Sequence, residues 1–143
     1  MDIDYNYIKN ILEFIKDGQT PYIDSSVVYK KYLDADEESA CNFIFHWHLI
    51  IENSLISTNT QAIYELKGSG LHPSPQYPMS FSRDEKRLRL TNLGIEFLSS
   101  LQEPKILDVI VQRFKHEGFS AVFEVSKQLG MKVINKKLED INF

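Results

Sequence analysis

Residues 87–91, with the sequence Arg-Leu-Arg-Leu-Thr, alternate strictly between polar and apolar side chains. Such a period of two is typical of a strand that buries one face, and it constrains the fold because most other apolar residues of this chain recur at helical spacing. A cruder alternation over residues 61–67 predicts a first strand, antiparallel to the second. Residues 68–86 between them contain three prolines and two glycines, so we expect a mobile loop there. These stretches together predict a β-hairpin with an enlarged tip.

Helical spacing of apolar residues predicts three helices before this hairpin, over residues 4–16, from about residue 24 to Leu33, and over residues 36–53. Asp4 and Asp36 are suitable N-caps for the first and third of these helices. Three further helical segments are predicted to begin at Thr91, Pro104 and Ser120. Gly130 weakens the last one, so we expect it to bend or divide there.

This order of elements predicts an α+β fold that is mostly α. Three helices followed by a two-stranded wing are the winged-helix arrangement, which we assign to residues 1–102 with a long wing loop at 68–86. Residues 103–143 are expected to form a helical extension that packs on this domain or mediates self-association, such as a homodimer through the C-terminal helices. A chain of 143 residues can bury a core of this size without disulfides.

The charge and cysteine content restrict the setting of the protein. The net charge is −4, and residues 1–56 alone carry four bases against ten acids, which makes that third of the chain strongly acidic. The N-terminus is acidic where a secretory signal would be basic, Cys41 is the only cysteine, and no apolar stretch is long enough to span a membrane. We therefore expect a cytoplasmic protein without a membrane partner.

Two stretches carry a family resemblance. Residues 47–56 (Trp-His-Leu-Ile-Ile-Glu-Asn-Ser-Leu-Ile) look like the end of a winged-helix recognition helix, with Ser54 where glycine is usual. Residues 88–98 are similar to the exit of a wing, with a Leu-Thr-x-x-Gly-x-x-Phe-Leu pattern in which Gly94 permits close contact. With its helical tail the chain resembles the bacterial and phage-associated family named domain of unknown function 2513. This resemblance implies the fold and a bacterial or prophage setting, and it implies no reaction.

The predicted recognition helix is poorly suited to DNA. Residues 37–53 contain no Lys or Arg, and their face opposite the core comprises Glu38, Asn42, Phe45, His46, Leu49, Glu52 and Asn53. Neutralisation of phosphates by Lys and Arg supplies essentially all non-specific DNA affinity. Asn42 could read an adenine edge, but no nearby base would hold the helix in the groove. The wing is better equipped, and we define the wing bases as Lys67, Arg83, Lys86, Arg87 and Arg89.

Two functions follow from these patterns. The leading prediction is a non-enzymatic, regulatory winged-helix module that contacts DNA mainly through the wing bases, with Asn42 as a further contact. The alternative is a protein-interaction module in which the former recognition-helix face, with Glu38, Phe45, His46, Leu49 and Glu52, binds a partner. An adaptor or inhibitor in phage–host conflict fits this alternative, and only the family resemblance suggests it.

Catalysis, metals and cofactors find little support in the sequence. His46 and His48 are two residues apart on a helix, so their side chains point in nearly opposite directions and cannot share one ion. Cys41 has no evident base and orienting group to make it a nucleophile. The Gly-Ser-Gly at residues 68–70 lacks the lysine and the helix of a phosphate loop. We therefore expect no enzyme activity, no metal and no cofactor.

Overall fold

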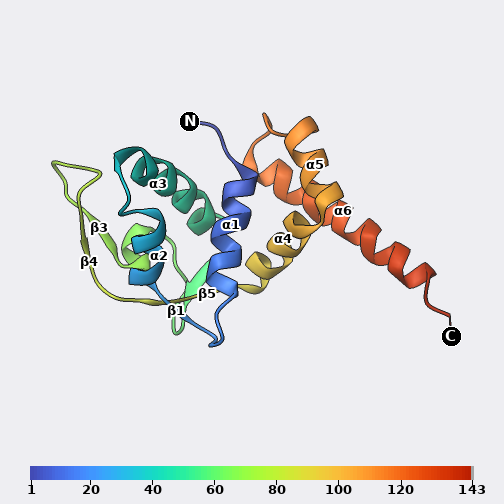
Figure 1. The fold of residues 1–143 in the computed structure, drawn as a ribbon, viewed down its shortest axis with the longest axis horizontal. Coiled ribbons are helices and arrows are strands. Elements are labelled where there is room, and N and C mark those ends of the chain that lie inside the picture. Colours follow the sequence, from blue (N-terminus) through green and yellow to red (C-terminus); the bar gives the residue numbers. More distant parts are fainter. Residues whose placement is uncertain (143) are drawn as a thin grey trace.

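A computed structural model describes residues 1–142 of the chain, in which helices predominate over a small amount of sheet (Figure 1). The predicted fold class, α+β and mostly α, is confirmed. None of the helices within residues 1–142 has the length and apolar character that crossing a bilayer requires.

The three predicted N-terminal helices are confirmed as α1 (Tyr5–Lys16), α2 (Ser25–Tyr32) and α3 (Glu37–Glu52). Asp4 caps α1 by accepting a hydrogen bond from the Tyr7 N–H at 3.1 Å, and Asp36 caps α3 by accepting one from the Ser39 N–H at 2.7 Å. Each cap satisfies a backbone donor that the first helical turn would otherwise leave unpaired. The helical spacing therefore placed both ends of α1 and α3 correctly.

The predicted recognition helix ends in a left-handed residue. Ser54 has φ of 58°, a conformation that glycine adopts at lower cost, and its N–H donates to the Ile51 carbonyl at 3.0 Å. This is the position at which the winged-helix motif usually has glycine. The turn reverses the chain so that Leu55 and Ile56 enter the core directly.

The main sheet has three short antiparallel strands in the order β1-β5-β2, with β1 at Ile23–Asp24, β2 at Ile56–Thr58 and β5 at Arg87–Leu90. The strand predicted from the alternation at 87–91 is thus confirmed, and it lies at the centre of the sheet. The strand predicted over residues 61–67 is wrong. Ala62 makes one isolated bridge with Ser57, and Ile63 and Leu66, three residues apart, are buried because they pack on the core.

The predicted irregular loop at residues 68–86 contains regular structure. A 3₁₀ turn, η1, spans Leu66–Ser69, and a second small sheet pairs β3 (Leu71–Pro73) with β4 (Phe81–Arg83). We call the segment over residues 66–83 the wing hairpin. It projects on the left in Figure 1, beyond α2.

Two buried hydrogen bonds tie the base of the wing hairpin to the helices, and a third lies within the hairpin. The Ser69 hydroxyl accepts a hydrogen bond from the Trp47 indole N–H at 3.2 Å. The Ser69 carbonyl accepts another from the Tyr29 hydroxyl. The Ser69 hydroxyl in turn donates to the Leu66 carbonyl at 2.6 Å. Gly70 has φ of 88°, and a Cβ there would lie 2.2 Å from the Asp84 carbonyl oxygen, so only glycine fits this crossing.

The C-terminal part consists of α4 (Asn92–Gln102), α5 (Pro104–Arg113) and α6 (Phe119–Glu139). Thr91 caps α4 as the motif implied, and a Cβ on Gly94 would lie 2.1 Å from the Leu55 carbonyl oxygen, so the close contact is with the chain leaving α3. The expected division at Gly130 is wrong, because α6 is one continuous helix of 21 residues.

One continuous core joins the two predicted domains. Ile106, Ile110, Phe119 and Val122 belong to the same buried cluster as the apolar face of α1, and the Tyr5 and Phe119 rings lie 6.0 Å apart. Helices α4 and α5 thus pack on α1, and the first half of α6 packs on α4 and α5. Phe143, the end of the predicted extension, lies outside the described residues.

Candidate functional site

The exposed face of the central strand carries two arginines. In β5 the side chains of Leu88 and Leu90 are buried and those of Arg87 and Arg89 are exposed, as the period of two requires. Arg87 lies opposite Asp24 of β1, and Arg89 lies opposite Ser57 of β2. The two guanidinium groups therefore emerge on the same side of the sheet.

The other three wing bases are paired with carboxylates. Arg83 makes a bidentate contact with Asp34, with nitrogen–oxygen distances of 2.9 and 2.5 Å. Lys86 lies 3.2 Å from Asp84, and Lys67 lies 3.1 Å from Glu65. Within residues 1–142, only Arg87 and Arg89 of the wing bases have no carboxylate partner.

The Arg83–Asp34 pair joins the base of the wing hairpin, where Arg83 pairs with Leu71, to the turn between α2 and α3. Its hydrogen bonds lower the pKa of Asp34 and raise that of Arg83. The Arg83 guanidinium also lies 5.9 Å from the ring centre of Tyr29, within the range of a cation–π contact. Arg83 therefore holds the hairpin in place, and a phosphate would have to compete with Asp34 for it.

A polar cleft of about 470 Å³ lies beside Arg87 at the foot of the wing hairpin. Its walls come from the turn after β2 and from the chain between β4 and β5, and include Thr58, Gln61, Gly68, Glu85 and Lys86. Glu85 accepts hydrogen bonds from the Ser26 N–H and hydroxyl, at 3.1 and 2.8 Å. The cleft thus offers polar side chains of both signs next to an unpaired arginine.

The outer face of α3 differs from the prediction at His46. This side chain is fully buried, so its placement among the exposed partner-binding residues is wrong. Its Nε2 accepts a hydrogen bond from the Asp4 N–H at 2.9 Å, and its Nδ1 lies 2.8 Å from the Asn42 carbonyl, so Nδ1 must carry the proton. Burial lowers the pKa of His46. His48 is exposed on the other side of the helix, as two-residue spacing requires.

The reason for this error is the segment that precedes α1. The helical wheel of α3 shows which residues face away from its main stripe, but it does not show that residues 3–7 lie against that side. Ile3 and Tyr7 pack on the core, and the Tyr7 and His46 ring centres are 4.8 Å apart. An acceptor nitrogen on His46 satisfies the backbone donor of Asp4 just outside the first turn of α1.

The remaining predicted residues of this face differ in their exposure. Glu38 and Glu52 are exposed, Leu49 is half-buried against the core, and Phe45 is half-buried with its ring edge-on to His46 at 5.1 Å. Asn42 is half-buried, and its carbonyl is occupied by His46. The face therefore combines two acids with one accessible aromatic ring.

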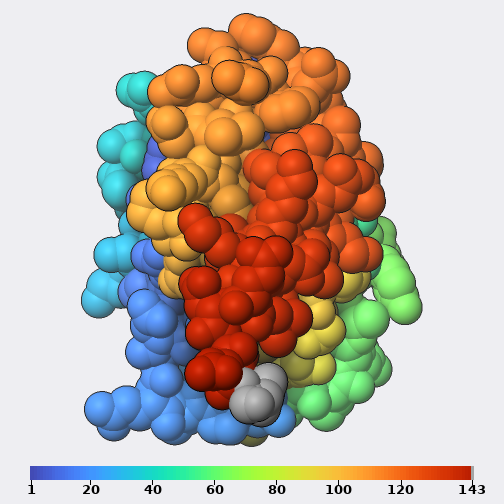
Figure 2. Space-filling model, turned by 90° about the vertical axis from the view of Figure 1, so that its right-hand side faces the viewer, coloured from blue at the N-terminus to red at the C-terminus, as the bar shows by residue number. Residues whose placement is uncertain are grey.

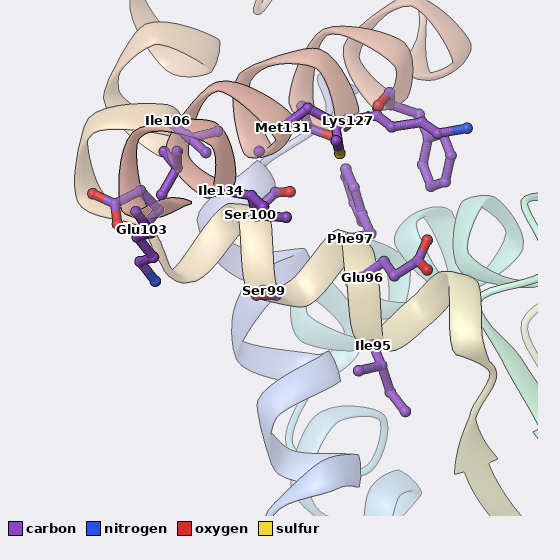
Figure 3. A pocket seen from close by; sticks show the side chains of 15 residues that line it. Ile95, Glu96, Phe97, Ser99, Ser100, Glu103, Ile106, Lys127, Met131 and Ile134 are labelled. Atoms are coloured by element: carbon purple, nitrogen blue, oxygen red, sulfur yellow. Dashed lines mark hydrogen bonds between the residues drawn. The ribbon is translucent and has the colours of Figure 1, made fainter. Parts of the chain in front are cut away.

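A third surface was not predicted as a site. Between α4 and α6 lies an apolar groove of about 470 Å³, and Figure 3 shows Phe97 of α4 pointing toward Met131 of α6 across it. Met131 and Ile134 are half-exposed, and only the spacing of residues 131, 134 and 138 could have revealed them in the sequence. Within residues 1–142, no three His, Cys, Asp or Glu side chains gather where they could hold a metal ion.

Comparison of the chain with protein-family models, curated proteins and solved structures found no match.

Proposed function

We propose that this protein is a winged-helix binding module without catalytic activity, and that it contacts duplex DNA through the exposed face of its sheet. The order α1-β1-α2-α3-β2-hairpin-β5, with β5 between β1 and β2, supports the winged-helix assignment. The left-handed Ser54 at the end of α3 supports it as well, because it occupies the usual glycine position of the motif.

The observation that carries the DNA contact is the pair Arg87 and Arg89. Both emerge on one side of the central strand and have no carboxylate partner within residues 1–142, whereas Arg83, Lys86 and Lys67 have one each. Unpaired guanidinium groups can form bidentate contacts with phosphate without first breaking an ion pair. Contact through α3 is disfavoured, since Glu38 and Glu52 would approach the phosphates.

The test is a salt titration of the fluorescence anisotropy of a labelled random duplex. We expect binding at low salt, with log affinity falling linearly against log salt concentration. Arg87→Gln/Arg89→Gln should weaken binding and reduce the salt slope by about one for each phosphate that the protein no longer neutralises.

Arg113→Gln/Lys115→Gln is the matched control. It removes the same charge from exposed positions at the end of α5, and it should keep the wild-type slope. Absence of binding at low salt, or equal weakening in both double variants, contradicts contact through β5.

The outer face of α3 favours a second function, the binding of a protein partner. Phe45 gives this face an aromatic group that is only half-buried, and Glu38 and Glu52 surround it with negative charge. Aromatic residues with a polar rim are typical of protein interfaces. If duplex DNA does not bind, Phe45→Ser should abolish retention of a specific partner, and Val27→Ser, on the exposed side of α2, should retain it.

A further inference from the structure

The distal half of α6 extends beyond the body of the protein. Phe119, Val122 and Ser126 of its first half are buried, and Val133 is half-buried, but every residue from Ile134 to Asn142 is exposed. Figure 1 shows this half of the helix pointing away from α4 and α5 toward the C-terminus. No described segment of the same chain covers it.

This exposed half carries a continuous apolar stripe. Met131, Ile134, Leu138 and Ile141 follow one another at intervals of three, four and three residues, and each keeps about half of its surface in solvent. The first three lie on one face of α6 at the spacing by which two helices pack, and Ile141 follows just after the helix ends at Glu139. Large exposed apolar groups in succession form a patch of the kind that marks an interaction surface.

The stripe continues into the groove between α4 and α6, since Met131 and Ile134 belong to both. The two helices cross closely at Gly130, where a Cβ would lie 3.0 Å from the Ser100 hydroxyl oxygen. Ile95 of α4 lines the same groove and is itself exposed. Figure 2 shows α6 standing over α4 on this side of the molecule.

The charges along the groove are arranged in two rims. Glu96 and Glu103 lie on the side of α4, and Lys127 and Lys137 lie on the side of α6. Within residues 1–142, none of these four takes part in an ion pair. A two-fold axis along the groove would place the lysine rim of each copy against the acidic rim of the other, so the surface is complementary to itself.

From these observations we infer that the α4–α6 groove and the distal stripe form a homodimer interface, in which the groove and the stripe of each copy pack against the groove and the stripe of its partner. Fifteen residues line the groove, and Leu138 and Ile141 extend its apolar surface beyond it. This inference is independent of whether the protein binds DNA.

The experiment is sedimentation velocity of the full chain over a micromolar concentration series. We expect a reversible monomer–dimer equilibrium in the wild type. Ile134→Glu/Leu138→Glu should weaken it at least about tenfold, because a dimer would bury two unpaired charges in each stripe. Val27→Glu/Tyr64→Glu, which changes two exposed apolar residues far from α6 in the same way, should leave it unchanged.

Exchanging the charges of the two rims tests whether a second copy of the chain occupies the groove. Glu96→Lys/Glu103→Lys should weaken dimerisation, and adding Lys127→Glu/Lys137→Glu to it should restore dimerisation by reversing both rims. Circular dichroism and thermal unfolding check that each variant folds, as expected for exposed positions. A wild type that stays monomeric throughout the series, a larger assembly, or a dimer insensitive to Ile134→Glu/Leu138→Glu overturns the inference.

Discussion

The wing hairpin and the distal half of α6 are opposites in composition and in packing. The hairpin region is rich in glycine and proline, yet Ser69 and Leu71 at its base are fully buried, and Arg83, which pairs with Leu71, is bound to Asp34. The distal half of α6 has mostly good helix formers, yet every residue from Ile134 onward is exposed. Long-range contacts thus order the wing hairpin, whereas local helical propensity orders the distal half of α6. Composition alone is therefore a poor guide to which segment packs on the core.

Gly70→Ala, in the wing hairpin, should cause the largest loss in the free energy of unfolding. The left-handed φ of 88° and the 2.2 Å approach to the Asp84 carbonyl both exclude a Cβ, so we expect a loss of about 3 kcal/mol in the free energy of unfolding. Urea denaturation measures it. Gly18→Ala is the control, because its Cβ would make only an ordinary contact, and a similar loss there would contradict the explanation.

Ser69→Ala should have the next largest effect. It leaves the buried Trp47 indole N–H without its acceptor, and an unpaired buried donor costs about 1–3 kcal/mol. Urea denaturation should show this loss, and the emission maximum or the intensity of Trp47 fluorescence should change. Ser82→Ala, at an exposed position of the same hairpin, should change neither the stability nor the fluorescence. If Ser69→Ala leaves the stability unchanged, the Ser69–Trp47 hydrogen bond contributes little.

His46 should make stability depend on pH. Burial lowers its pKa in the folded protein, so the unfolded chain binds the proton more readily. The stabilisation is therefore complete above the unfolded value of about 6.5 and is lost as the pH falls toward the folded pKa, with a slope of at most about 1.4 kcal/mol per pH unit. Urea denaturation between pH 7 and 5 should show this slope in the wild type and in His48→Gln, and its loss in His46→Gln. A slope that persists in His46→Gln would assign it to other groups.

Gly130→Ala should have the smallest effect and the opposite sign, which sharpens the contrast with Gly70. Alanine in a helix interior is favoured over glycine by about 0.5–1 kcal/mol, less the cost of moving the Ser100 hydroxyl, which lies 3.0 Å from the new Cβ. Thermal unfolding at one fixed protein concentration should show a small rise in Tm. Adding Ser100→Ala should increase it, and a loss of several degrees in both variants would mean that α4 and α6 cannot separate at this crossing.

The sequence predicted those elements whose pattern is local. The caps at Asp4, Asp36 and Thr91 and the alternation in β5 need only neighbouring residues, and each was found as expected. The strand predicted over residues 61–67 failed because Ile63 and Leu66 are buried by the core and not by strand pairing. The two buried residues are three apart, a spacing that does not match the period of two of a strand.

The candidate sites were only partly accessible to sequence reasoning. The wing bases were found by their residue type, but which of them lack a carboxylate depends on Asp34, which is 49 residues from Arg83. The outward face of α3 was found by its helical period, but the burial of His46 depends on Asp4, which is 42 residues away.

The sequence by itself determined the helices, their caps, the exposed arginine pair on β5 and the acidic character of α3, because periodicity and charge are properties of neighbouring residues. The tertiary structure alone decided that β5 lies at the centre of the sheet, that Ser69 and Arg83 fix the wing hairpin, and that α6 projects with an uncovered apolar stripe. Each of these depends on residues far apart in the chain, which meet only when the hydrophobic core forms.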